Sequence, residues 1–389
     1  MTANLRHAAG SLLVVGLSGT ELTGLERAWL NLVKPGGIIL FRRNIIDANQ
    51  TRALLDESTH LCLPNSVRCV DVEGGTVNRL RNVLAIPSAQ AVAAADRRTT
   101  SGTGKRKARS FGDSKLSHKH GELIARAVKA FGFNTALAPV VDLTLPESVG
   151  VMGSRTPGAT AAEVIEYARA FLNGMAAQDV IGCGKHFPGL GGANSDSHFE
   201  TPQITRSWKQ IWDEDLIPYR ELKDAMPMVM VNHAAYPQTP GKDKPASASD
   251  FWVTKVLRER VKYRGLIVTD DLEMGGILKF MPVDEAAIAA VRAGSDLILI
   301  CHSAEIILRT YEALIAESER SSAFRRLLLA RESESTKKRV RLYKNGSRKQ
   351  LTAIQFEALR VQMERFRGSI EAIGGDAIDP RAAAPAETS

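Results

Sequence analysis

The chain has 389 residues, of which 44% are hydrophobic, and a formal net charge of +8 at pH 7. This composition is ordinary for a globular protein and leaves room for one large barrel or two medium domains. No apolar run approaches the roughly 20 residues that cross a bilayer, and the run at 12–17 is too short for a signal-peptide core, so we expect a cytoplasmic protein that does not bind membranes.

Eight short apolar runs recur along the chain, and most are continuous rather than alternating. Continuous runs are typical of strands buried on both faces of a parallel sheet. Three of the four cysteines lie in these runs without metal-ligand spacing, so we expect them to be small core residues. The eight predicted strands cover residues 12–17, 37–41, 67–72, 135–141, 180–184, 228–231, 266–269 and 297–301.

Helical patterns separate the predicted strands. Asp284 is expected to cap a helix over 285–293 that ends at Gly294. Strands that alternate with helices eight times predict an α/β fold, a (β/α)8 TIM-type barrel over residues 1–315. A doubly wound open sheet is the alternative, although no GxGxxG motif follows the first strand.

The pattern changes after residue 315, where we expect a basic helical extension over 316–373 and a disordered tail over 374–389. The extension carries a narrow apolar seam that suits a helix lying on another surface. This seam packs either on the outer helices of the barrel or on a second copy, so the chain is expected to be a monomer or a homodimer through the C-terminal helix. The seam consists of Phe356, Leu359, Met363, Phe366 and Ile370.

The positive charge is concentrated in two segments. Residues 320–350 hold eleven Lys and Arg residues against two Glu residues, and a shorter basic run occupies 97–109. Neither segment is interleaved with aromatic residues suited to base stacking. We therefore interpret both as solvated charge and do not expect a nucleic-acid partner.

Polar side chains follow five of the predicted strands at their carboxyl ends. In a barrel these ends converge on one face, where active sites are built, so residues far apart in sequence become neighbours. The strand-end residues are Asp71 and Glu73, Asp142, Lys185 and His186, Asn232 and His233, and Asp270 and Asp271.

Two features of the sequence indicate catalysis. Asp196 and His198 are two residues apart in the loop 185–198, so in an extended chain the carboxylate can hold the imidazole as a general acid/base. The strand at 266–269 runs directly into Asp270, and the tip of a buried strand is a rigid place for a nucleophile.

Seven segments resemble bacterial β-N-acetylhexosaminidases of glycoside hydrolase family 3, in order and at similar spacing over roughly residues 10–315. The most specific is the loop from Lys185-His186-Phe187-Pro188-Gly189 to Asp196-Ser197-His198. The others begin at residues 37, 71, 138, 153, 233 and 268, and the last contains Thr269-Asp270-Asp271-Leu272.

The resemblance implies a retaining exo-β-N-acetylglucosaminidase that needs neither a metal nor an organic cofactor and that acts on terminal N-acetylglucosamine of a small carbohydrate or cell-wall muropeptide. It assigns the nucleophile, which forms a covalent glycosyl-aspartate, to Asp270 and the acid/base to His198, supported by Asp196. The sugar-binding residues that it implies are Asp71, Arg79, Arg155, Lys185 and His186.

Physical chemistry fits these roles, because retention needs one carboxylate to attack the anomeric carbon while another group protonates the leaving oxygen. An imidazole beside an anion donates and then accepts a proton near neutral pH, whereas Asp270 must stay ionised, which Lys185 favours. We expect structural roles for Asp271 and Glu273. Three departures from the family pattern, Val72, Thr76 and Leu190, are expected to alter either the rim of the sugar pocket or the aglycone site.

Other functions stay open from sequence alone. Phosphate in place of water as acceptor would make the chain a phosphorylase, and another family 3 β-glycosidase activity is a further alternative. A metal-dependent barrel hydrolase would use His186, His198, His233, Asp196 and Asp270 as ligands. A non-catalytic protein would bind glycans or nucleic acid through the basic segments.

Overall fold

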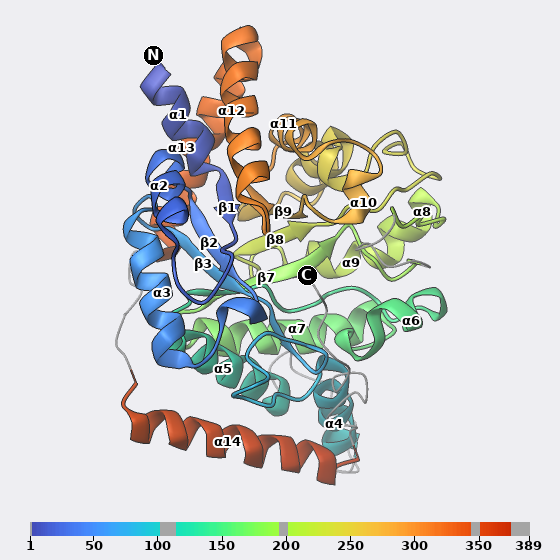
Figure 1. The fold of residues 1–389 in the computed structure, drawn as a ribbon. Helices are drawn as coiled ribbons and strands as arrows, with labels where there is room; N and C mark the ends of the chain where they lie inside the picture. Colours follow the sequence, from blue (N-terminus) through green and yellow to red (C-terminus); the bar gives the residue numbers. More distant parts are fainter. Residues whose placement is uncertain (1, 102–113, 194–200, 344–350, 375–389) are drawn as a thin grey trace.

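The computed structural model describes residues 2–101, 114–193, 201–343 and 351–374, and its centre is a closed barrel of eight parallel strands (Figure 1). The strands follow one another around the barrel in the order β1-β10-β9-β8-β7-β6-β3-β2. The predicted barrel is therefore confirmed and the open sheet is wrong, because β1 pairs with both β2 and β10. The strands are β1 (Leu13–Val15), β2 (Gly37–Leu40), β3 (Val67–Val70), β6 (Thr135–Ala136), β7 (Ile181–Phe187), β8 (Met228–Val231), β9 (Leu266–Asp271) and β10 (Leu297–Ile300).

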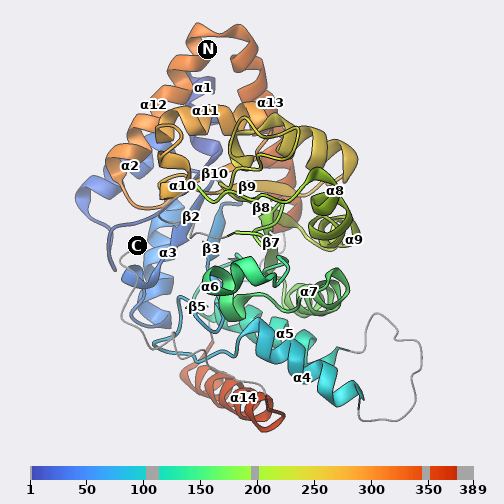
Figure 2. The ribbon, with the colours of Figure 1, turned by 90° about the vertical axis from the view of Figure 1, so that its right-hand side faces the viewer.

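Helices surround the strands, and α1 (Thr2–Ser11) precedes the first of them (Figure 2). A small antiparallel hairpin, β4 (Val72–Gly74) and β5 (Val77–Asn78), leaves the end of β3. The α-helices of the barrel are α2 (Gly24–Val33), α3 (Ala48–His60), α4 (Ala89–Ser101), α5 (Lys115–Ala130), α6 (Val149–Met152), α7 (Ala161–Ala176), α8 (Trp208–Gln210), α9 (Ile217–Leu222), α10 (Gly275–Leu278), α11 (Val283–Ala293) and α12 (Ala304–Arg320). The 3-10 helices are η1 (Arg42–Asn44), η2 (Pro146–Ser148), η3 (Gly153–Arg155) and η5 (Ala246–Ala248). The π-helices are η4 (Ile211–Asp215) and η6 (Phe251–Arg260).

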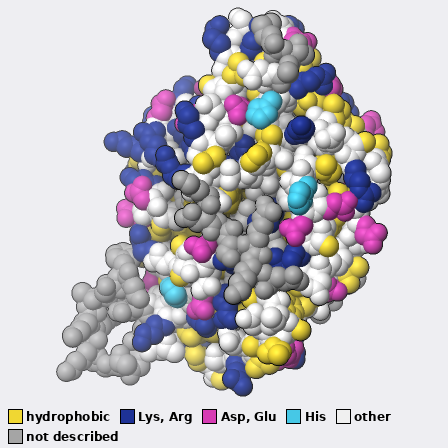
Figure 3. All heavy atoms as spheres, turned by 90° about the vertical axis from the view of Figure 1, so that its left-hand side faces the viewer, with side chains coloured by type: hydrophobic (Ala, Val, Ile, Leu, Met, Phe, Trp, Pro, Cys, Tyr) yellow, Lys and Arg dark blue, Asp and Glu magenta, His cyan; other side chains and the backbone are white. Residues whose placement is uncertain are grey.

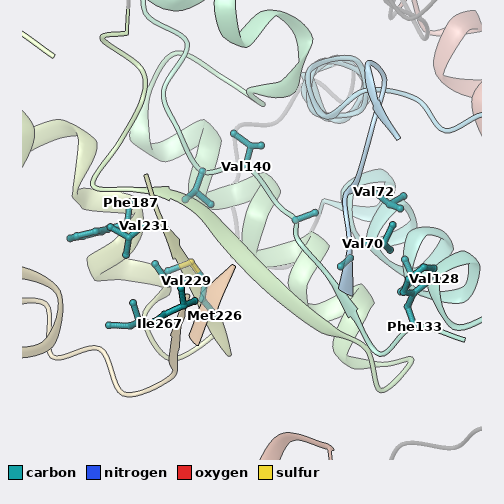
Figure 4. Packing of buried hydrophobic residues seen from close by; sticks show 14 of the residues in the cluster. Val70, Val72, Val128, Phe133, Val140, Phe187, Met226, Val229, Val231 and Ile267 are labelled. Carbon is teal, nitrogen blue, oxygen red and sulfur yellow. The ribbon is translucent and has the colours of Figure 1, made fainter. Parts of the chain in front are cut away.

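The strands divide the apolar side chains between two cores. One core fills the barrel interior and contains Cys69, Cys183 and Cys301, which confirms that these cysteines are buried core residues. The other core lies between the strands and the helices, and Figure 4 shows part of it around Val70, Phe187 and Val229. This arrangement fixes the strands on both faces, as the continuous apolar runs predict.

One predicted helix boundary is wrong and its opposite end is confirmed. Helix α11 starts at Val283, and its N-cap residue is Pro282 rather than Asp284. Asp284 lies instead in the first turn, where a carboxylate interacts favourably with the helix dipole. Gly294 ends the helix with a φ of 111°, a left-handed conformation that suits glycine.

The last two helices are α13 (Ser322–Tyr343) and α14 (Ala353–Ala372), and α14 packs against α5 and α4 (Figure 1). Its apolar seam faces the barrel, since Phe366 stacks on His120 of α5 at 6.0 Å between ring centroids. At the far end of α14, the Arg98 guanidinium donates to the Ile373 carbonyl at 2.9 Å. The seam therefore packs on the outer helices of its own barrel. A homodimer through the C-terminal helix stays a prediction, as does the division into domains at residue 315.

Part of the basic segment 320–350 is buried, which corrects its interpretation as solvated charge. Asp296, which is fully buried at the start of β10, accepts hydrogen bonds from Arg258 and from Lys338 Nζ at 3.0 Å. Arg339 is 1% exposed, and its Nη2 donates to Ser11 Oγ at 2.7 Å. These contacts fix α13 on the base of the barrel, the end at which the strands begin.

The base of the barrel is also closed by the end of α13. The Tyr343 hydroxyl lies 2.8 Å from Thr135 Oγ1 at the start of β6, and burial raises the pKa of this phenol. A cavity of about 800 Å³ opens beside it, lined by Arg68, Arg264 and Tyr343 among others.

On the face shown in Figure 3, Lys and Arg side chains gather toward the upper left, with Asp and Glu side chains scattered among them.

Within the ranges described above, no helix is both long enough and apolar enough to cross a membrane. Most of the shorter basic run, from residue 102 onward, lies outside those ranges, and so does the predicted tail beyond Gly374.

Candidate active site

The carboxyl ends of the barrel strands bring most of the predicted site residues to one face of the barrel. All but Arg155 are held by a strand or by the segment that directly follows one, so their positions are set by the barrel itself. Asp71 follows β3, Arg79 follows β5, Arg155 lies in η3, Lys185 and His186 lie in β7, and Asp270 lies in β9.

A buried group of ions, the mouth cluster, joins Asp71, Glu73, Arg155 and Lys185. Lys185 Nζ lies 2.7 Å from Asp71 Oδ1 and 2.6 Å from Glu73 Oε1. Arg155 binds Glu73 with both nitrogens of its fork, Nε at 2.8 Å and Nη2 at 2.9 Å. Arg79 lies at the edge, with Nη2 4.0 Å from Asp71 Oδ2. Such charge-assisted groups suit the binding of sugar hydroxyls.

The ions of the mouth cluster hold one another in their charged forms. Burial alone would raise the pKa of Glu73, but the charges of Arg155 and Lys185 outweigh it and lower that pKa. Burial alone would lower the pKa of Lys185, and the carboxylates of Asp71 and Glu73 raise it instead. Both side chains are therefore ionised at neutral pH.

Asp270 is a half-buried carboxylate at the end of β9. Among the described residues, the one hydrogen bond to this carboxylate comes from the Asp271 backbone N–H, which is 2.9 Å from Oδ1. Burial would raise the pKa of Asp270, but nearby positive charge, including the ammonium of Lys185, lowers it. The carboxylate is thus ionised and keeps an oxygen available for a nucleophilic attack.

Hydrogen bonds fix the tautomer of His186. Arg155 Nη2 lies 3.2 Å from His186 Nε2, and a guanidinium can only donate, so Nε2 accepts. The proton of the neutral imidazole is therefore on Nδ1, which donates to Asp142 Oδ2 at 2.8 Å. The ring is held between a cation and a carboxylate.

His233, which follows β8, holds the backbone beside Asp270. Its Nε2 lies 2.9 Å from the Asp271 carbonyl, which can only accept, so Nε2 carries the proton. Its Nδ1 then accepts from the Ser247 hydroxyl at 2.7 Å. Burial lowers the pKa of His233, which favours this neutral form.

Asp271 and Glu273 have structural contacts, as expected. Asp271 Oδ2 lies 3.1 Å from His302 Nε2, and Glu273 accepts the backbone N–H groups of His302 and Ser303. These bonds join the end of β9 to the segment that follows β10.

The structure places three further residues in contact with the site: Glu73, Asp142 and His233. Sequence reasoning gave Glu73 and Asp142 no individual role and considered His233 only as a ligand in the metal-dependent alternative. Their position at the strand ends was the available signal. It could not separate them from Asp271, which lies at the same kind of position. Of the three departures from the family pattern, Val72 and Leu190 are buried and Thr76 is half-buried, so Thr76 has the most accessible side chain.

Asp196 and His198 lie outside the described residues, so their predicted roles stay predictions. Among the described residues, no group of three His, Cys, Asp or Glu side chains is arranged to hold a metal ion. Both ring nitrogens of His186 and of His233 are already engaged in the hydrogen bonds given above.

Comparison with known proteins identifies the class of this barrel. Residues 5–328 match the family model described as the glycosyl hydrolase family 3 N terminal domain. A protein named Beta-hexosaminidase from Idiomarina loihiensis is 33% identical over 317 residues, which are 80% of this chain and 90% of that protein. One from Alkalilimnicola ehrlichii is 35% identical, over 76% of this chain and 82% of that protein.

Solved structures show the same likeness. A family 3 β-N-acetylglucosaminidase from Paenibacillus sp. superposes with a TM-score of 0.80 at 28% identity and covers 94% of this chain and 68% of its own. NagZ from Neisseria gonorrhoeae, in complex with N-trifluoroacetyl-D-glucosamine, superposes with a TM-score of 0.72 at 26% identity, over 95% of this chain and 98% of its own.

Proposed function

The chain belongs to glycoside hydrolase family 3, and on this basis we propose that it is a retaining exo-β-N-acetylglucosaminidase that hydrolyses terminal β-linked N-acetylglucosamine. The observation that carries the proposal is the half-buried Asp270 carboxylate at the end of β9, whose pKa is held below its usual value by nearby positive charge, including Lys185. The relatives named Beta-hexosaminidase and the sugar-bound neighbour from Neisseria gonorrhoeae support the class of sugar.

In the first step of this mechanism, an oxygen of Asp270 attacks the anomeric carbon and the bond from that carbon to the leaving oxygen breaks. His198 gives its proton to the leaving oxygen, and a covalent glycosyl-aspartate forms. In the second step, water attacks the anomeric carbon and passes a proton to His198. The ester bond then breaks and releases the sugar and the Asp270 carboxylate with retained anomeric configuration.

The remaining residues bind and orient the sugar in this proposal. Asp71, Arg155 and Lys185 accept from or donate to its hydroxyl groups, and charge-assisted hydrogen bonds of this kind are about twice as strong as neutral ones. Arg79 and His186 contribute at the edges of the same cluster. Because the ions are already held in place by one another, little reorganisation is needed when the sugar binds.

We extend the proposal to the source of the substrate, which is cell-wall muropeptides in the cytoplasm. The family resemblance and the sequence-based expectation of a cytoplasmic protein support this assignment. Release of N-acetylglucosamine from a purified muropeptide by the full chain, together with activity in the cytoplasmic fraction of cells, would test it.

The function is tested with a panel of aryl β-glycosides and three proteins: the unmodified chain, Asp270→Ala and His198→Ala. We expect preference for the N-acetylglucosaminide and near-total loss for Asp270→Ala. His198→Ala should lose most activity on substrates with poor leaving groups, because these need the proton most. Equal activity of Asp270→Ala and the unmodified chain would overturn the mechanism.

Two additions to the assay separate the alternatives. Sugar 1-phosphate as the sole product in the presence of phosphate would replace the hydrolase with a phosphorylase. Activity that a chelator abolishes and zinc restores would favour a metal-dependent hydrolase instead.

A further inference from the structure

The buried carboxylate of Asp142, which follows β6, contacts two separate parts of the site. We propose that Asp142 is a positioning residue that fixes both the tautomer of His186 and the backbone of the turn 186–190, which leads toward the predicted acid/base. The kinetic part of this proposal rests on the proposed glycosidase function, whereas its structural part does not.

The first part of the argument is the geometry around the two carboxylate oxygens. Asp142 Oδ2 accepts from His186 Nδ1 at 2.8 Å and from the His186 backbone N–H at 3.1 Å. Oδ1 accepts from the Leu190 backbone N–H at 2.8 Å. The side chain of Asp142 is fully buried, so these protein donors replace its water.

The second part is the effect on the imidazole. With the proton on Nδ1, His186 presents a lone pair on Nε2 to Arg155. The other tautomer would place an N–H against the Arg155 guanidinium, leaving two donors face to face and a buried donor without an acceptor. Asp142 therefore couples His186 to the mouth cluster in one orientation, since Arg155 is itself held by Glu73.

The third part is the effect on the turn. Asn232 Nδ2 donates to the His186 carbonyl at 3.0 Å, and the Tyr236 hydroxyl donates to the Gly189 carbonyl at 2.8 Å. Asp142 takes the N–H groups at both ends of the same turn. Of these three side chains, Asp142 is the one that also binds the His186 ring. One carboxylate therefore holds both a sugar-binding residue and the backbone at the start of the 185–198 loop.

Asp142→Asn is the sharpest variant because an amide offers one acceptor and one donor end. If the NH2 group of the amide points toward His186, it meets the Nδ1–H of the ring and favours the tautomer protonated on Nε2. If the NH2 group points toward Leu190, it meets the Leu190 backbone N–H. Either orientation breaks one of the two functions while the volume of the side chain is unchanged.

Asp96→Asn is the matched control. Asp96 of α4 is also buried and also accepts two backbone N–H groups, from Leu116 at 3.0 Å and Ser117 at 2.7 Å, but it lies outside the site. A general loss of stability would affect both variants, whereas a loss of positioning affects Asp142→Asn alone.

The structural test is ¹⁵N NMR of the histidine rings, with His186 assigned by its absence in His186→Gln. In the unmodified chain we expect a neutral His186 with its proton on Nδ1. An Nε2-protonated or doubly protonated ring would overturn the proposal, and this measurement needs no variant at position 142 to fold and no activity.

The kinetic test compares kcat/KM for aryl N-acetylglucosaminides with good and poor leaving groups. We expect Asp142→Asn to lose about 10²-fold, as a misplaced group in an active site does. Asp142→Asn should also lose activity when His186 is already replaced by Gln, because the effect on the turn does not depend on the imidazole. This loss should be larger for substrates with poor leaving groups, which need the acid/base most. A kcat/KM within about twofold of Asp96→Asn would overturn the proposal, while an unmodified chain that cleaves no aryl glycoside would overturn the proposed function instead.

Discussion

The mouth and the base of the barrel each contain a buried group of ions, and they differ in what lies beside it. At the base, Asp296 is fully buried and accepts hydrogen bonds from Arg258, from Lys338 and from the Ile267 backbone N–H. At the mouth, both carboxylate oxygens of Glu73 are paired with Lys185 and Arg155. The neighbouring Asp270 is half-buried, and among the described residues its carboxylate accepts one hydrogen bond. Buried charge alone therefore does not indicate an active site. An ionised carboxylate with one oxygen that accepts no hydrogen bond from the described residues does.

Asp270→Asn tests this comparison most severely. We expect kcat/KM to fall on the order of 10⁴-fold or more, because the nucleophile is removed. The free energy of unfolding should change by no more than about 1 kcal/mol, since the carboxylate has few protein partners. Steady-state kinetics and urea unfolding measure the two effects, and a large loss of stability with retained activity would reverse the roles of the two ends.

Asp296→Asn should give the opposite result. Removing the charge leaves the half-buried Arg258 and Lys338 without their fully buried carboxylate, and breaking a buried ion pair typically costs about 3–5 kcal/mol. We expect that loss in urea unfolding and a kcat/KM within about twofold of the unmodified chain at temperatures where the variant is folded.

The exposed Asp224, which lines the cavity at the base, provides the control for Asp296→Asn. Asp224→Asn should change the free energy of unfolding by less than about 0.5 kcal/mol. Equal effects of the two variants would show that the buried ions at the base do not hold α13.

Glu73→Gln sharpens the comparison through its pH dependence. The folded-state pKa of Glu73 is lowered, so its ionisation contributes stability above the unfolded pKa of about 4.3 and that contribution is lost as the pH falls through the folded value. We expect the variant to be less stable by about 3 kcal/mol at pH 7. The difference should shrink below about pH 4, and a difference that is constant with pH would argue against an ionised Glu73.

Tyr343→Phe should have the smallest effect. It removes the hydroxyl that lies 2.8 Å from Thr135 Oγ1 at the base, and a typical hydrogen bond contributes about 1 kcal/mol. Thermal unfolding measures this loss, and activity should not change. A clear loss of activity would mean that the base influences the mouth.

The contrast between the two ends also explains what sequence could predict. The eight strands were predictable because each is a continuous apolar run, and the mouth was predictable because polar residues follow those runs directly. The base was not, because Lys338 and Arg339 look like solvated charge until the fold brings Asp296 and Ser11 to them.

Within the mouth, Asp270 was predictable from its position at the end of an apolar strand. The roles of Glu73 and Asp142 were not, because they depend on the orientation of Arg155 and His186, which lie in other segments. Sequence spacing gives the face of a barrel on which a side chain lies, but not the atom it contacts. The start of α11 shows the same limit for a helix boundary. The helix begins at Val283 rather than after Asp284, because several adjacent residues were able to begin it.

The pairing of β1 with β10 has a consequence for synthesis on the ribosome. The register joins Leu13 to Ile298, so the first strand leaves the exit tunnel long before its neighbour exists. Until then one edge of the growing sheet is unpaired, and Asp296 must wait longer still for Lys338. A nascent chain that stalled between these two points would keep an unpaired strand edge exposed, and such edges promote aggregation.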